Sequence, residues 1–283
     1  MYGLYHRLMD SRRMCPHCRA FITIKDKVCP YCNERVGPRA IDRRSPADFF
    51  GGLIPHARFN TIVILLANFG LYLVSTLYSM RAGGGGTFSG IDGGTLFAFG
   101  AKYGSAIAAG QWWRLVTAGF LHGGLLHILM NSWVLFDLAP QVEELFGAGR
   151  MWVIYFASTV GGFYLSNLWN PRTISVGASA ALCGLIGAMI ALGVMHRSAM
   201  GDAIRSTYLR WAVYILIFSF LPGVDMAAHV GGGITGFAVA YVAGTPRYEG
   251  APVERLWQGG AWICLGLTGL SFALWWIWFS HAS

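Results

Sequence analysis

Residues 228–236 of the chain read AHVGGGITG, and this stretch decides how we expect the chain to fold. In a helix, His229, Gly232 and Gly236 fall on one face, at spacings of three and four residues. Gly232 and Gly236 form the small-xxx-small pattern that lets membrane helices approach one another closely. We therefore predict a membrane helix that packs tightly against a neighbour and carries a histidine on its packing face.

The composition of the whole chain also indicates a membrane protein. The 283 residues are 55% hydrophobic and 12% charged, whereas a soluble domain carries about 25% charged residues. Of the 21 lysines and arginines, 11 lie between Arg7 and Arg58, ahead of the first apolar span. That is typical of the cytoplasmic flank of a first transmembrane helix. The basic residues form no stripe interleaved with aromatics, so we expect no nucleic-acid partner.

The order of polar and apolar segments predicts four regions. They are a small cysteine domain (1–37), a basic linker (38–58), a six-helix core (59–245) and an inner loop with a seventh helix (246–283). The predicted spans are Thr61–Met80, Leu125–Leu138, Met151–Trp169, Ser179–Met195, Tyr208–Phe220, Ala228–Ala243 and Trp262–Phe279. The long Gly-rich stretch from Arg81 to about Leu121 is too apolar to lie in water. We expect it to be partly embedded against the bundle, with Trp112 and Trp113 at the membrane interface.

The distribution of basic residues predicts the orientation. Arginines concentrate in the predicted loops Ala139–Arg150, His196–Arg210 and Gly244–Gly260, which are therefore expected on the inner side. We predict a multi-pass protein of the bacterial cell (inner) membrane, with a cytoplasmic N-terminus and the C-terminus outside.

Three places carry polar groups where a membrane makes them expensive. His127 and Asn131 are four residues apart and share a helix face, so they either stabilise a developing oxyanion or hydrogen-bond between helices. Ser179 begins a span after Gly177, where a serine either caps the helix or acts as a nucleophile. Ser179, Cys183 and Gly187 then form a stripe of small side chains.

His229 lies near the outer end of its predicted helix, as Ser179 does in its own. If the small faces of these two helices meet, the two side chains lie level, which is the arrangement of a nucleophile and its general base. Asp225 precedes His229 by one helical turn. It either caps that helix or orients the histidine as a third catalytic group.

Together, these segments resemble the rhomboid family of intramembrane serine proteases over residues 55–245. The similar motifs are Trp113-Arg114 in the first outer loop, His127-x-x-x-Asn131, Gly177-Ala178-Ser179, and Ala228-His229-x-x-Gly232-x-x-x-Gly236. The resemblance implies an all-α membrane fold with a six-helix core, here followed by one added helix.

The same resemblance implies an endopeptidase that cleaves transmembrane protein substrates in the lipid bilayer without a catalytic cofactor. It implies a Ser179–His229 dyad, with an oxyanion hole from His127, Asn131 and the Ser179 backbone N–H. Trp113 and Arg114 would anchor the first loop, and Glu143 would be structural in the loop after the second helix.

Two departures from the family pattern leave an alternative open. Ala180 stands where the family usually has glycine, and Cys183 stands where an aromatic residue often stacks on the histidine. The alternative is an inactive rhomboid-like protein that binds membrane clients. A small-solute transporter is disfavoured, because paired acids within the spans are lacking.

Four cysteines precede the spans as two CxxC pairs, Cys15/Cys18 and Cys29/Cys32. This spacing suits a tetrahedral, structural zinc ion in a zinc-ribbon-like domain. Two disulfides are the alternative, which a cytoplasmic location disfavours. We expect the domain to be structural or to bind a protein partner.

Overall fold

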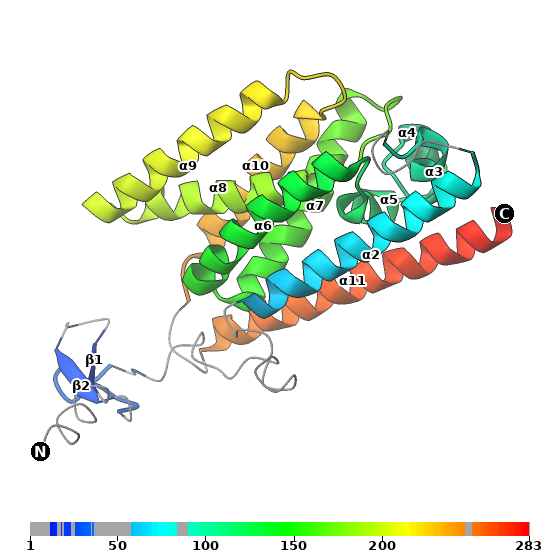
Figure 1. Cartoon of the computed structure of the whole chain (residues 1–283). Coiled ribbons are helices and arrows are strands. Elements are labelled where there is room, and N and C mark those ends of the chain that lie inside the picture. The colour runs from blue at the N-terminus through cyan, green and yellow to red at the C-terminus, as the bar shows by residue number, and fades with distance from the viewer. Residues whose placement is uncertain are drawn as a thin grey trace, which may run out of the picture.

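Seven long helices form the body of the protein within the residues that its structure, a computed structural model, describes: 12–15, 18, 20–23, 26–34, 36, 58–83, 90–246 and 251–282 (Figure 1). They are α2 (Phe59–Arg81), α6 (Leu125–Phe146), α7 (Ala148–Trp169), α8 (Ser179–Met195), α9 (Ala199–Phe218), α10 (Met226–Ala243) and α11 (Pro252–Ala282). The all-α fold with six core helices and one added helix is as predicted from the sequence. The predicted linker, residues 38–58, lies outside the described residues except for Arg58.

Helix α8 is the centre of the bundle. Of its 17 residues, 13 are buried, and α10, α7 and α9 pack around it. Its neighbour α9 is the opposite case, because Gly201 is its one buried residue. A helix that is apolar all round and buried all round belongs in the core of a bundle, so the sequence of α8 alone accounts for its place.

Several helices are suited to cross a membrane. By length and composition, α2, α10 and α11 could each span a bilayer. The segments Arg114–Phe120 and Leu125–Phe146 meet the same test as a pair bent by 91°. Helix α8 is apolar but has 17 residues, which is short for a full crossing. A short central helix that begins below the surface keeps its N-terminal end within the bundle.

Three predicted helix boundaries are wrong. Helix α6 continues through Pro140 to Phe146, because a proline in a helix costs a hydrogen bond that surrounding packing can outweigh. Helix α9 begins at Ala199 rather than Tyr208, with Ser198 capping it by accepting from Gly201 N–H. Helix α11 begins at Pro252 rather than Trp262. Most of each predicted inner loop is therefore helical.

The described part of the stretch between α2 and α6, residues 90–124, contains four short helices. They are α3 (Gly93–Ala98), α4 (Gly104–Ala108), α5 (Arg114–Thr117) and the 3-10 turn η4 (Ala118–Phe120). Asp92 caps α3 and accepts hydrogen bonds from Thr95 and from Ser79 of α2. These bonds, chiefly from the Thr95 side chain, lower the pKa of Asp92 to about 2. The stretch is thus fastened to the bundle, as its apolar composition predicted.

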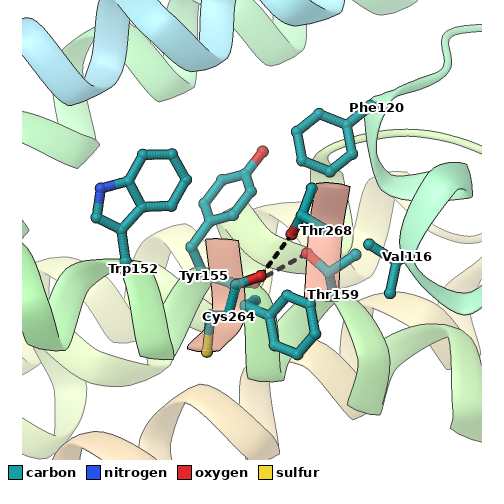
Figure 2. A pocket seen from close by; sticks show the side chains of 8 residues that line it. Val116, Phe120, Trp152, Tyr155, Thr159, Cys264 and Thr268 are labelled. Carbon is teal, nitrogen blue, oxygen red and sulfur yellow. Dashed lines mark hydrogen bonds between the residues drawn. The ribbon is translucent and has the colours of Figure 1, made fainter. Parts of the chain in front are cut away.

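The C-terminal helix α11 packs along α7 and α5. Figure 2 shows the apolar contact, which leaves a cavity of only about 10 Å³ among side chains that include Val116, Phe120 and Tyr155. The hydroxyls of Thr159 and Thr268 bond back to carbonyls of their own helices. The α7–α11 packing in this region therefore rests on close apolar contact.

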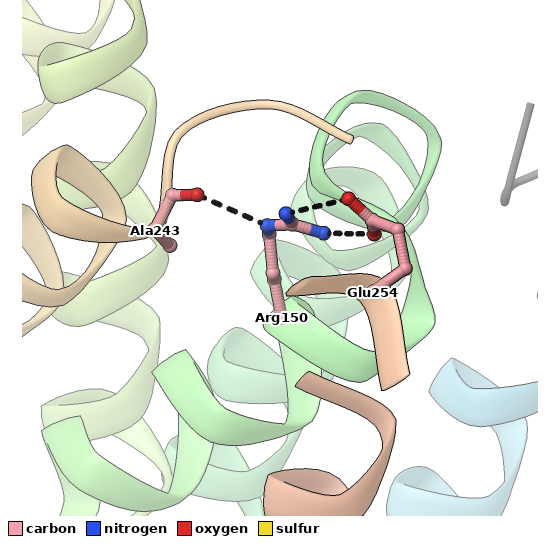
Figure 3. A network of polar contacts seen from close by, with 3 residues as sticks. All are labelled: Arg150, Ala243 and Glu254. Carbon is pink, nitrogen blue, oxygen red and sulfur yellow. Dashed lines mark hydrogen bonds and ion pairs between the residues drawn. The ribbon is translucent and has the colours of Figure 1, made fainter. Parts of the chain in front are cut away.

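A buried ion pair joins the first turns of α7 and α11 (Figure 3). Arg150 is 2% exposed and Glu254 is 5% exposed. Their two N···O distances are 2.6 and 2.9 Å, and Arg150 Nε also donates to the Ala243 carbonyl at the end of α10. One guanidinium thus connects three helices, with both partners removed from solvent.

Replacing Glu254 by alanine is expected to destabilise the protein by about 3–5 kcal/mol, because it leaves the Arg150 charge buried without its carboxylate. The midpoint of thermal unfolding in detergent would fall accordingly. The double variant Arg150→Met/Glu254→Leu is the control, and should recover most of the loss because it removes both charges. A single variant no less stable than this double variant would contradict the assignment.

Candidate active site

Ser179 and His229 face each other across the contact between α8 and α10. Ser179 Oγ lies 2.8 Å from His229 Nε2. Ser179 is the first residue of α8, and the capping position belongs to Ala178, which makes no side-chain cap. The hydroxyl of Ser179 is therefore directed to the histidine rather than to the start of its own helix.

Glycines let the two helices come this close. A Cβ at Gly232 would overlap the carbonyl oxygen of Ala180, and a Cβ at Gly236 would overlap that of Gly184. The residues of α8 that meet these two glycines are thus Ala180 and Gly184. The predicted stripe of Ser179, Cys183 and Gly187 also takes part in the contact, because Ser179 reaches His229 and a Cβ at Gly187 would overlap the carbonyl oxygen of Gly233.

Ala180 fits its position because α7 makes room for it. A Cβ on Gly162 of α7 would lie only 2.8 Å from the Ala180 methyl group, so the hydrogen of that glycine accommodates the methyl. Ala180, which stands where the family usually has glycine, is thus packed without distorting the start of α8.

His127 lies on the other side of Ser179. Its Nδ1 accepts from the Gly123 N–H at 3.4 Å, so the ring hydrogen is on Nε2. Gly177 has a φ of 132°, and a Cβ there would lie 2.7 Å from His127 Nε2 and 3.4 Å from Ser179 Oγ. The missing side chain leaves a small space between an N–H donor and the serine hydroxyl.

Asn131 is buried one turn along the same helix as His127. Its Nδ2 donates to the His127 carbonyl at 3.1 Å, which leaves the second amide hydrogen for another acceptor. The structure thus brings His127 and Ser179 to the same small space at Gly177, with Asn131 one turn further along α6.

Asp225 caps α10. Its carboxylate accepts from the Ala228 N–H at 3.0 Å and is hydrogen-bonded to the Ser166 hydroxyl. The second ring nitrogen of the histidine, His229 Nδ1, instead lies 2.6 Å from Ser219 Oγ, just after the end of α9. Sequence reasoning missed Ser219, because a serine at a helix end gives no signal of a partner ten residues away.

An apolar cavity of about 430 Å³ lies among α8, α9 and α10. Cys183 and His229 both line it, and its other walls are aliphatic side chains, glycines and Phe237. Cys183 is buried, as a small hydrophobe would be. With cysteine at this position, the cavity reaches His229.

Trp113 and Arg114 lie at the start of α5. Arg114 is fully buried, and its Nη1 donates to the carbonyls of Phe97 and Ala101 at 2.7 and 2.9 Å. Its guanidinium also lies over the rings of Phe97 and Trp278. Arg114 therefore connects the stretch between α2 and α6 to α11, while Trp112 is 42% exposed.

Glu143 lies within α6, not in the loop predicted for it, because α6 extends to Phe146. Its Oε1 accepts from Asn60 Nδ2 at 2.6 Å, and Asn60 Oδ1 accepts from Trp152 Nε1 at 3.0 Å. Through Asn60, Glu143 is thus part of a hydrogen-bond chain that joins α2, α6 and α7.

The four N-terminal cysteines gather around one point. Strands β1 (Arg12–Met14) and β2 (Phe21–Thr23) pair antiparallel, and the four Sγ atoms lie within 4.8 Å of one another. Two of the distances are Cys15–Cys32 at 3.6 Å and Cys18–Cys29 at 3.7 Å. Tetrahedral ligands at about 2.3 Å from one ion lie about 3.8 Å apart, so these thiols could hold a metal ion.

Comparisons with known proteins identify the family of the chain. Residues 109–246 match the Rhomboid domain. The chain is 30% identical over 142 residues to the putative rhomboid protease YdcA of Bacillus subtilis (strain 168), covering 50% of this chain and 71% of that protein. The chain belongs to the rhomboid family.

Two longer relatives match this rhomboid protein over part of their length. It is 35% identical over 181 residues to the rhomboid protease GluP of Bacillus subtilis (strain 168), which is 64% of this chain and 35% of that protein. It is 35% identical over 158 residues to the mitochondrial RHOMBOID-like protein 6 of Arabidopsis thaliana, which is 55% of this chain and 52% of that protein. This rhomboid protein thus spans about a third to a half of these relatives. Its family and its apolar helices make it an integral membrane protein.

Proposed function

We propose that this protein is an intramembrane serine endopeptidase that cleaves transmembrane protein substrates within or near the bilayer. The observation that carries the proposal is the 2.8 Å hydrogen bond between Ser179 Oγ and His229 Nε2 in a bundle of apolar helices. Relatives named as rhomboid proteases support it.

In the proposed reaction, Ser179 Oγ attacks the scissile carbonyl carbon while its proton passes to His229 Nε2. The tetrahedral intermediate collapses to an acyl-enzyme, and the same proton goes to the leaving amine. Water then attacks the acyl-enzyme, gives its proton to Nε2, and the second collapse returns that proton to Ser179. His229 thus acts as base and then acid in each half of the reaction.

The oxyanion is proposed to lie above Gly177. His127 Nε2–H is directed there, the Ser179 backbone N–H is at the start of α8, and Asn131 supports the same region. A side chain at position 177 would occupy this space. The catalytic step needs no cofactor.

The cavity beside the dyad favours an apolar substrate segment. A volume of about 430 Å³ is within the range of ligand pockets, and its aliphatic walls suit a hydrophobic side chain. Because His229 lies at this cavity, a segment that enters it comes next to the reacting groups.

The proposal is tested with purified protein in liposomes, a fluorophosphonate probe and a model single-span substrate. We expect cleavage of the substrate, and a covalent label that peptide mass spectrometry locates on Ser179. Folded protein that is neither labelled nor able to cleave would instead support the alternative, a rhomboid-like protein that binds clients without cutting them.

We further propose that the ion held by Cys15, Cys18, Cys29 and Cys32 is a structural zinc. Four cysteine ligands leave no open position for a catalytic water. The full-length protein is expected to contain one zinc per chain, and Cys29→Ser to lose it. Cys264→Ser, which changes a cysteine of α11, is the control and should keep the metal. A Cys29→Ser protein with its full zinc content would contradict the site.

The domain boundaries and the orientation are proposals as well. We propose a zinc-ribbon-like domain at residues 1–37, a basic linker, a core at 59–245 and an added helix, in a bacterial inner membrane with the N-terminus in the cytoplasm. The excess of basic residues before α2 supports this orientation. The ribbon is then exposed to the cytoplasm, where a protein could bind it.

A further inference from the structure

His229 is hydrogen-bonded at both ring nitrogens to serine hydroxyls from two different elements. Nε2 lies 2.8 Å from Ser179 Oγ of α8, and Nδ1 lies 2.6 Å from Ser219 Oγ at the end of α9. Ser219 is 4% exposed. The imidazole is thus held between the proposed nucleophile and a second, buried serine.

The hydrogen on the Ser219 hydroxyl already has an acceptor. Ser219 Oγ donates to the Ile215 carbonyl at 2.7 Å, and a carbonyl oxygen can only accept. A hydroxyl has one hydrogen, so toward His229 the same oxygen acts as an acceptor. Nδ1 must therefore carry the ring hydrogen, and Nε2 is left with the lone pair that accepts the proton of Ser179.

The burial of Ser219 is unusual for its surroundings. In α9 itself Gly201 is the one buried residue, and Ile215 and Leu216 line the cavity that lies between α9 and α10. Ser219 comes just after the residues that line the cavity. Its bond to His229 brings the end of α9 into contact with α10. The contact between these helices at this end includes a polar bond to the catalytic histidine.

We propose that Ser219 is a positioning residue that holds His229 in the Nδ1–H tautomer. This inference rests on the proposed function, because a general base at Nε2 requires that tautomer. Ser219 takes the place that an acid fills in a serine protease triad. It keeps the ring oriented when Nε2 is protonated, and as a neutral acceptor it does so without a charge.

Ser219→Ala is expected to lower kcat about tenfold with KM nearly unchanged, because it removes one hydrogen bond from the transition state. Ser219→Thr retains the hydroxyl and should stay within about threefold of the original kcat. Ser206→Ala is the matched control. Ser206 is an exposed serine of α9 that also bonds back to its own helix, and its loss should leave kcat unchanged.

A second readout does not depend on cleavage. In protein labelled with ¹⁵N-histidine, the nitrogen shifts of His229 report which ring atom carries the hydrogen. We expect one Nδ1–H tautomer in the original protein and in Ser219→Thr, and a mixture in Ser219→Ala. If the protein cleaves nothing, the proposed function fails while this spectrum still decides the role of Ser219.

Two results would overturn the proposal. One is a Ser219→Ala protein whose His229 keeps a single Nδ1–H tautomer. The other is a Ser219→Thr protein that loses as much kcat as Ser219→Ala although its own His229 keeps the single Nδ1–H tautomer, which would make Ser219 a packing residue only.

Discussion

Replacing Ser179 by alanine is expected to reduce substrate cleavage by about 10⁴-fold or more, because no other group can form the acyl-enzyme. His229→Ala should lose a similar factor, since Ser179 then has no base at 2.8 Å. The double variant should be little worse than either single variant, because the two residues act as one unit. Initial rates on a single-span substrate in liposomes measure all three.

The same samples test the assignment of the nucleophile. Fluorophosphonate labelling should vanish in Ser179→Ala and persist in Ser280→Ala, which alters an exposed serine of α11. Labelling that survives in Ser179→Ala would show that another residue reacts, and would refute the site. Additive losses in the double variant would also argue against a dyad.

Gly232→Ala is expected to destabilise the protein by about 1–3 kcal/mol and to reduce cleavage about 10²-fold. A methyl group at this position overlaps the Ala180 carbonyl, so α10 must move away from α8. The movement separates His229 from Ser179, because His229 lies one turn earlier on α10 and Ser179 precedes Ala180. A displacement of about 1 Å is enough for a loss of this size.

Gly70→Ala is the matched control. Gly70 lies inside α2, and a Cβ there meets no atom within 4 Å. The substitution changes the same residue type inside a long helix, so helix propensity affects both variants alike. Thermal unfolding in detergent and initial cleavage rates compare the two. Equal losses in both variants would mean that general effects of alanine, not the α8–α10 contact, explain the result.

Much of the site could be predicted from the sequence because its parts follow helical spacing. Gly232 and Gly236 indicated a close helix contact, and Ser179 and His229 were expected to lie level across it. The predicted start of α8 at Ser179 was also correct, because Gly177 before it is a local signal of a turn. The prediction that Asp225 caps the next helix of the site was correct as well, because an aspartate just before a helix is a local signal of a cap. Which small residues of α8 make the contact depends on rotation about the helix axis, which spacing alone does not define.

Other features depend on contacts between distant parts of the chain. Helix α6 continues past Pro140 because packing and the Glu143–Asn60 bond hold its last turns. Ser219 contacts His229 because α9 ends beside α10, and Arg150 is paired because Glu254 of α11 lies next to it. No short-range pattern pairs such residues, so the sequence shows the groups without showing their partners.

The buried ion pair has a consequence for how a new chain matures. Glu254 follows Arg150 by 104 residues, so a ribosome has added six of the seven long helices before the arginine meets its carboxylate. Trp275 and Phe279, whose rings pack on Phe99 in the stretch between α2 and α6, emerge later still. Helix α11, which is made after the other six long helices, therefore completes both ends of the bundle. A chain synthesised only as far as the end of α10 has its serine and histidine but not the supports that α11 brings, which delays the proposed peptidase until α11 has been made.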